Sequence, residues 1–250
     1  MGGVVVSRVS RSFLLFGTFM AYVVVAFVIN VVLETRPVLA TCVFDAAVVF
    51  VFRPRGRFAR TFDAGLPRGD FPRSRLFGMV VLWVVFWFGT QVTVTVLASA
   101  GVSTGVYPSL PGEEYFFYVV LTVFLAPVAE EFFFRAFLFG HLRRLVPFWV
   151  ACLAQGVVFA WAHGSGVHWY VGVVCGLAFA FLYVWTGDVR VSACFHAFYN
   201  LLCVLGAMVP VPSVVLEPGF VVGFNVLVVL LMVLAGFRLG VRLLPGERVS

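Results

Sequence analysis

Hydrophobic residues fill most of the chain in eight long runs, which short polar or proline-containing connections separate. A run of roughly 18 or more apolar residues is long enough to cross ~30 Å of hydrocarbon as a helix. The prolines lie between the runs or at their ends, where they terminate helices. The pattern predicts membrane-spanning helices over residues 12–33, 38–52, 76–98, 115–141, 147–163, 169–186, 191–209 and 219–237.

Composition excludes a water-soluble domain. The chain is 62% hydrophobic and 11% charged, with a mean hydropathy of +1.08. A soluble globular domain carries about 25% charged residues. We therefore expect an all-α polytopic membrane protein, with about eight transmembrane helices surrounding an intramembrane polar cavity. Residues 1–250 are interpreted as one integral membrane domain.

Charge placement predicts the topology. All 17 basic residues are arginine, and every second connection between runs is basic. Because basic loops stay on the cytoplasmic side, both termini are predicted to be cytoplasmic. The arginine-rich stretch 53–75 is interpreted as a loop that meets anionic lipid headgroups rather than nucleic acid. The basic positions are Arg8, Arg11, Arg36, Arg53, Arg55, Arg57, Arg60, Arg68, Arg73, Arg75, Arg135, Arg143, Arg144, Arg190, Arg238, Arg242 and Arg248.

The five cysteines all lie in apolar runs, and no two of them form a CxxC pair. Free cysteine commonly serves as a small buried hydrophobe. Neither disulfides nor a thiolate zinc site is therefore expected.

Three charged residues interrupt the apolar run 115–141: Glu130, Glu131 and Arg135. An ionised side chain at the centre of a bilayer costs at least ~2.5–3.5 kcal/mol, and such groups usually pair with each other and mark a functional path. Residues four apart share one face of a helix, so Glu131 can pair with Arg135. That pair alone could also serve only to hold the helix in place.

Later runs supply further polar side chains. His163 follows Phe159 by one helical turn, and His196 precedes Asn200 by the same spacing. A single histidine in a membrane helix is often a packing residue, and a single asparagine often links helices. Asp45 is interpreted as a further pairing group, as is Gln91. The ordered combination of EExxxR, FxxxH and HxxxN on successive runs favours a functional site.

The chemistry of these groups suits the hydrolysis of an amide bond. A carboxylate next to an apolar wall can act as a general base, and an imidazole can share a water molecule with it. Asparagine and histidine side chains can donate hydrogen bonds to a developing oxyanion. With two adjacent glutamates and one arginine, one carboxylate can pair with the cation while the other transfers the proton.

The three motifs resemble those of the CPBP intramembrane proteases, also called the Abi or CAAX-protease family, which includes the Ras-converting CAAX prenyl endopeptidases. The resemblance covers residues 115–209 and includes Trp185, Thr186 and Gly187, which look like the family's turn. The rest of the chain carries no motif that matches.

The resemblance implies a role for each residue of the first two motifs. Glu130 would be the base that activates water, and His163 would assist it. Glu131 would support the site, and Arg135 would orient substrate or the neighbouring carboxylates.

The third motif, with His196 and Asn200, would by the same resemblance stabilise the oxyanion. The family implies water activation without metal, and the sequence contains no HExxH motif. No cofactor is therefore expected. Zinc remains an alternative, because two histidines and two glutamates could bind it.

The sequence therefore predicts an intramembrane endopeptidase of a prokaryotic cell membrane, which acts on a peptide or a membrane protein. Whether the substrate is lipidated stays open. One alternative is a non-catalytic scaffold or bacteriocin self-immunity protein of the same fold. A proton-coupled transporter is the other, although no inverted repeat is apparent.

Overall fold

The computed structural model describes residues 8–32, 37–52, 76–103, 112–164, 166–206 and 217–238, and this part of the chain contains helices and no strand. Helices occupy all eight predicted runs, so the all-α fold class is confirmed. One run is a composite rod, described below. The other seven helices are α1 (Arg8–Val32), α2 (Pro37–Phe52), α4 (Leu76–Ser99), α8 (Phe148–Ala162), α9 (Val167–Thr186), α10 (Val189–Gly206) and α11 (Pro218–Arg238).

The rod over residues 112–142 alternates between α-helical and π-helical turns. It consists of α5 (Gly112–Val120), the π-helix η2 (Leu121–Leu125), α6 (Ala126–Glu130), the π-helix η3 (Glu131–Phe139) and α7 (Gly140–Leu142). Pro127 lies in the first turn of α6, where it cannot donate a backbone hydrogen bond to the turn before it. π-Helical turns are rare and often occur at functional sites. Here η3 covers Glu131 and Arg135 of the charged motif.

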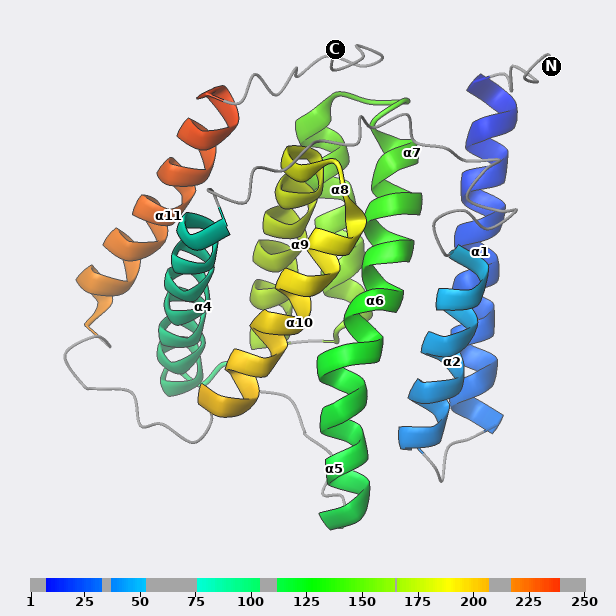
Figure 1. The fold of residues 1–250 in the computed structure, drawn as a ribbon, viewed down its shortest axis with the longest axis horizontal. Coiled ribbons are helices and arrows are strands. Elements are labelled where there is room, and N and C mark those ends of the chain that lie inside the picture. Colours follow the sequence, from blue (N-terminus) through cyan, green and yellow to red (C-terminus); the bar gives the residue numbers. More distant parts are fainter. Residues whose placement is uncertain are drawn as a thin grey trace.

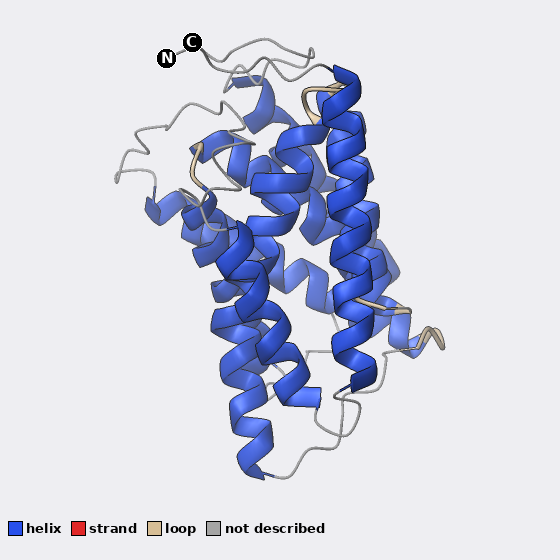
Figure 2. Ribbon diagram, turned by 90° about the vertical axis from the view of Figure 1, so that its right-hand side faces the viewer, coloured by secondary structure: helices blue, strands red, loops and turns tan. Residues whose placement is uncertain are grey.

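The long helices run roughly along a common direction (Figures 1 and 2). In Figure 1 the α1–α2 pair lies beside the rod, α8, α9 and α10 occupy the centre, and α4 and α11 lie on the opposite side. The rod thus lies between the α1–α2 pair and the central helices.

Four of the described helices are long and apolar enough to cross a membrane: Phe77–Ser99, Gly112–Leu142, Val167–Thr186 and Val189–Gly206. The shorter apolar helices are Phe16–Ala26, Val38–Phe52, Phe148–Ala162 and Gly219–Val228. Large apolar side chains cover the outer faces, with Phe77 79% exposed and Phe124 63% exposed. These features are those of a polytopic membrane protein. The arginine-rich stretch 53–75 lies outside the described residues, so the orientation in the membrane stays a prediction.

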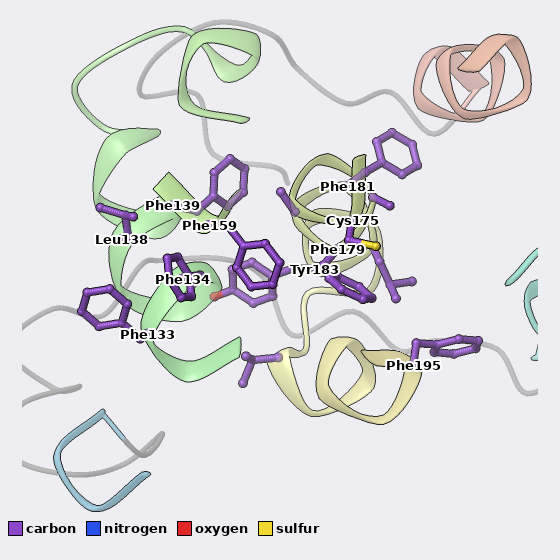
Figure 3. Packing of buried hydrophobic residues seen from close by; sticks show 14 of the residues in the cluster. Phe133, Phe134, Leu138, Phe139, Phe159, Cys175, Phe179, Phe181, Tyr183 and Phe195 are labelled. Carbon is purple, nitrogen blue, oxygen red and sulfur yellow. The ribbon is translucent and has the colours of Figure 1, made fainter. Parts of the chain in front are cut away.

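Aromatic rings fill the centre of the bundle. Phe134 of the rod packs edge-on against Phe159 of α8 at 4.9 Å between ring centroids (Figure 3). Phe179 of α9 is fully buried, as is Phe133 of the rod. Tyr22 of α1 stacks on Phe133 at 3.7 Å, which attaches the α1–α2 pair to the rod.

Glycines let α8 and α9 approach each other closely. A Cβ atom added to Gly172 would lie 2.5 Å from the Cα of Ala160, and one added to Gly176 would lie 2.7 Å from the Cα of Gly156. Small residues allow this kind of close packing between membrane helices. The contact fixes α8 against α9 and thereby positions the residues at the end of α8.

Replacing Gly172 by alanine should destabilise the protein, because the new methyl group would meet backbone that cannot move aside. Overpacking of this kind costs ~1–3 kcal/mol. Thermal unfolding of the purified protein in detergent would show a lower midpoint for Gly172→Ala. Gly78→Ala is the matched control, since nothing lies within 4 Å of a Cβ at that position. Equal midpoints for the two variants would contradict the close contact.

Candidate active site

Glu131 is the most completely bound polar group of the site. Its side chain is fully buried. Its Oε1 atom lies 3.0 Å from Nη1 of Arg135 and 2.9 Å from Nδ1 of His196. Its Oε2 atom accepts a hydrogen bond from the Ser192 hydroxyl. Arg135 of the same rod thus neutralises the Glu131 carboxylate, and Ser192 and His196 of α10 form hydrogen bonds to it.

Arg135 is also fully buried and lies between aromatic rings. The centre of its guanidinium is 4.3 Å from the Phe159 ring and 5.0 Å from the Phe179 ring. Its Nε, Nη1 and Nη2 atoms make no hydrogen bond, so the ion pair with Glu131 and the ring faces provide the favourable contacts of the guanidinium. In this position Arg135 acts on Glu131 and is not accessible to a substrate.

Glu130 differs from its neighbour. Its side chain is 21% exposed, and its Oε2 atom lies 3.6 Å from Nε2 of His163 and 3.7 Å from Nε2 of His196. These separations exceed those of a direct hydrogen bond. The Glu130 carboxylate therefore faces two imidazoles without being hydrogen-bonded to either, and it remains available for proton transfer.

The Nδ1 atom of each imidazole is held by a hydrogen bond. Nδ1 of His163 lies 2.7 Å from the Phe159 carbonyl oxygen, and Nδ1 of His196 lies 2.9 Å from the Glu131 carboxylate. Because both partners are acceptors, each Nδ1 carries the hydrogen. In the neutral rings Nε2 is then an acceptor, and both Nε2 atoms are directed at Glu130.

Aromatic contacts orient the same two rings. The His196 ring stacks on Phe179 at 4.2 Å between centroids, and the His163 ring contacts Phe159 at 4.2 Å. Figure 3 shows Phe159 and Phe179 close together in the centre of the bundle. The same two phenylalanine rings lie against the Arg135 guanidinium. Phe159 and Phe179 therefore contact both the ion pair and the two imidazoles.

Asn200 lies one turn after His196 on α10. Its Nδ2 atom donates a hydrogen bond of 2.8 Å to the carbonyl oxygen of Thr122 in η2, about two turns before Glu130 along the rod. This amide therefore attaches α10 to the π-helical turn. The structure brings Glu130, Glu131, Arg135, His163 and His196 together, and it places Asn200 beside them with its donor directed at the backbone.

Ser192 was not among the predicted site residues. It lies one turn before His196, so Ser192, His196 and Asn200 form an i, i+4, i+8 series on one face of α10. Only this periodicity could have indicated it. The other polar groups named from the sequence lie elsewhere: Gln91 donates to the Cys203 thiol at 3.4 Å, and Asp45 is buried on α2.

The histidine and glutamate side chains of the site are potential metal ligands. Across the described residues, no group of three or more His, Cys, Asp or Glu side chains is arranged to hold a metal ion. The expectation that no cofactor is used stays a prediction. Without a metal, these side chains can transfer protons and form hydrogen bonds.

Comparison with known proteins identifies the same segment. Residues 112–202 match a family model described as "Type II CAAX prenyl endopeptidase Rce1-like", and this range contains all six predicted site residues. The chain is 30% identical over 93 residues to the "Putative membrane peptidase YdiL" of Bacillus subtilis (strain 168). The match covers 37% of this chain and 38% of that relative. No solved structure matches the chain. The resemblance predicted from the three motifs is confirmed over this core.

The buried ion pair can be tested by replacing Arg135 with methionine, which has a similar shape and no charge. The Glu131 carboxylate would then remain buried without its cation, a change that costs ~3–5 kcal/mol. Thermal unfolding in detergent should show a large loss of stability. Arg190→Met is the control, because that arginine is exposed and its pairing with Asp188 contributes little. Similar losses in both variants would show that Glu131 does not depend on Arg135.

Proposed function

We propose that this chain, which carries an Rce1-like core, is an intramembrane endopeptidase that hydrolyses a peptide bond with water activated by Glu130. The substrate class is a peptide segment of a membrane-associated protein, reached from within or beside the lipid. The name of the Bacillus subtilis relative and the description of the matching family both support peptidase activity.

The observation that carries the proposal is the difference between the two adjacent glutamates. Glu131 is fully buried, pairs with Arg135 and is hydrogen-bonded to two residues of α10, whereas Glu130 has no hydrogen bond at Oε2 and is 21% exposed. A structural ion pair would explain the first carboxylate and leaves the second unexplained. A general base needs a carboxylate that is held in place and still free to accept a proton.

In the proposed reaction the Glu130 and His163 side chains move apart from their 3.6 Å separation, and a water molecule enters between Oε2 and Nε2. Both groups are acceptors, so a water can donate one hydrogen to each and direct an oxygen lone pair at the substrate carbonyl carbon. Glu130 takes one proton as the carbon–oxygen bond forms. It returns that proton to the leaving amine when the carbon–nitrogen bond breaks, so the enzyme ends in its starting state.

The oxyanion formed in this step requires a hydrogen-bond donor. We assign this role first to His196, whose Nε2 atom faces the same site as Glu130. For this role the ring carries a hydrogen on both nitrogens before water attacks and keeps both throughout, so the proton balance of the hydrolysis is unchanged. Asn200 already uses its amide donor on the Thr122 carbonyl. The second hydrogen of the same amide group is the one that could reach the oxyanion, and the bond to Thr122 fixes the direction of that hydrogen.

Glu130→Gln tests the proposal. The amide cannot accept the proton, so cleavage should fall by about 10²–10⁴-fold while the unfolding midpoint stays close to that of the wild type. The measurement is a proteomic comparison of membranes containing wild type or variant, followed by cleavage of an identified peptide by purified protein in liposomes. Glu113→Gln is the matched control, since Glu113 is exposed at the start of the rod. Undiminished cleavage by Glu130→Gln would eliminate the proposed base.

Metal independence is tested by chelation. Because the proposed water is activated by Glu130 and His163 alone, dialysis against EDTA or 1,10-phenanthroline should leave the cleavage rate of the purified protein unchanged. Loss of activity that returns when Zn²⁺ is added would show that a metal activates the water instead.

A further inference from the structure

Ser192 is a fully buried serine of α10 that takes no part in the proposed reaction itself. Its hydroxyl donates a hydrogen bond to Oε2 of Glu131, and the carbonyl oxygen of Phe179 lies 3.4 Å from the same hydroxyl. A hydroxyl group has one hydrogen to donate, and a charged acceptor forms the stronger bond. The hydrogen of Ser192 is therefore directed at the Glu131 carboxylate.

The two oxygens of Glu131 have different partners. Oε1 lies 3.0 Å from Nη1 of Arg135 and 2.9 Å from Nδ1 of His196, so this oxygen interacts with both the arginine and the imidazole. At Oε2 the donor is Ser192. This division of partners defines one orientation of the carboxylate plane, in which Oε1 is directed at His196.

Arg135 competes with Ser192 for Oε2. The Nε, Nη1 and Nη2 atoms of Arg135 make no hydrogen bond, so the guanidinium has donors to spare. An arginine and a carboxylate often pair through two parallel hydrogen bonds, and the terminal torsion of a glutamate has a broad range of orientations. Without the Ser192 hydroxyl, we expect the Glu131 carboxylate to turn both oxygens toward the guanidinium. Oε1 would then move away from His196.

The bond between Glu131 and His196 fixes the direction of the imidazole. The His196 ring stacks on Phe179 at 4.2 Å between centroids. Stacking restrains the plane of a ring and leaves it free to turn within that plane. The bond at Nδ1 prevents this turn, and it thereby holds Nε2 at 3.7 Å from Oε2 of Glu130.

We propose that Ser192 is a positioning residue, which holds the Glu131 carboxylate in the orientation that keeps the Nδ1–H bond of His196. Ser192 thereby keeps Nε2 of His196 directed at the site. This rests on the proposed function, in which His196 stabilises the oxyanion. No proton passes through Ser192, so the balance of the hydrolysis is unchanged.

The orientation of Glu131 is measured first, without any need for activity. Solid-state NMR of protein with ¹⁵N-labelled histidine in liposomes should show the Nδ1–H proton of His196 far downfield, as a hydrogen bond to a carboxylate requires. The signal is assigned by its loss in His196→Gln. Ser192→Ala should move it upfield, whereas Ser192→Thr, which keeps the hydroxyl, should leave it in place.

Thr90→Val is the matched control. The Thr90 hydroxyl lies 2.7 Å from the hydroxyl of Tyr199, so this variant also removes a buried hydrogen bond to α10 but leaves Glu131 untouched. Its Nδ1–H signal should stay at the wild-type position. An unmoved signal in Ser192→Ala would overturn the proposal, as would equal shifts in Ser192→Ala and Thr90→Val.

The effect on the reaction is measured as a split between kcat and KM. Ser192→Ala should lower kcat by about 10–10²-fold, because misplacing a catalytic group by ~1 Å can cost 10²-fold. KM should stay unchanged, since the oxyanion forms only in the transition state. Ser192→Thr should restore kcat. If the added methyl group of threonine unfolds the protein, the comparison of Ser192→Ala with wild type and Thr90→Val decides alone.

The other outcomes are distinct. If Ser192→Ala lowers the unfolding midpoint but moves neither the Nδ1–H signal nor kcat, Ser192 is only structural and the proposal is wrong. A moved signal with an unchanged kcat would also overturn it, because the orientation of Glu131 would then not affect the reaction. If the wild-type protein cleaves no peptide, the proposed function fails, whereas the NMR comparison still decides whether Ser192 orients Glu131.

Discussion

The site depends on neutralising one carboxylate inside a hydrophobic bundle. Glu131 is fully buried, and its ion pair with Arg135 at 3.0 Å lies between the aromatic rings of α8 and α9. Removing such a charge from water is unfavourable unless each lone pair finds a donor. Since the remaining donors come from α10, this requirement fixes α10 against the rod. The polar bonds thus determine which helices meet at the centre.

Glu130 directly precedes Glu131 in the helix, and its environment differs from that of Glu131. Consecutive residues of a helix point about 100° apart, so the Glu130 side chain points in a different direction from that of Glu131. Glu130 instead faces His163 and His196, and each imidazole is already fixed by its other nitrogen. His196 belongs to both groups, since it binds Glu131 through Nδ1 and faces Glu130 through Nε2. The buried carboxylate of Glu131 and the proposed base Glu130 are thereby connected through one ring.

Much of this arrangement could be predicted from the sequence. Long apolar runs give the helices directly, and i, i+4 spacing correctly pairs Glu131 with Arg135. The π-helical turns were not predicted, and neither was the bond from Asn200 to the Thr122 carbonyl in one of them, because both involve contacts that residue spacing does not indicate. Ser192 was missed for a related reason. A serine in an apolar helix is common, and only the distant Glu131 gives this one its role.

Hydrolysis inside a membrane also needs a supply of water, and the length of α8 bears on this. The helix Phe148–Ala162 has 15 residues and spans ~22 Å, whereas the hydrocarbon layer is ~30 Å thick. A straight helix of this length is therefore too short to cross the layer by itself. His163 ends this helix, its side chain is 35% exposed, and Gly164 follows with a φ of 99°. Irregular backbone within the layer is tolerated where it is buried in protein or lines a water-filled cavity. For the proposed reaction, the exposed end of α8 beside Glu130 is the place where water can approach the carboxylate.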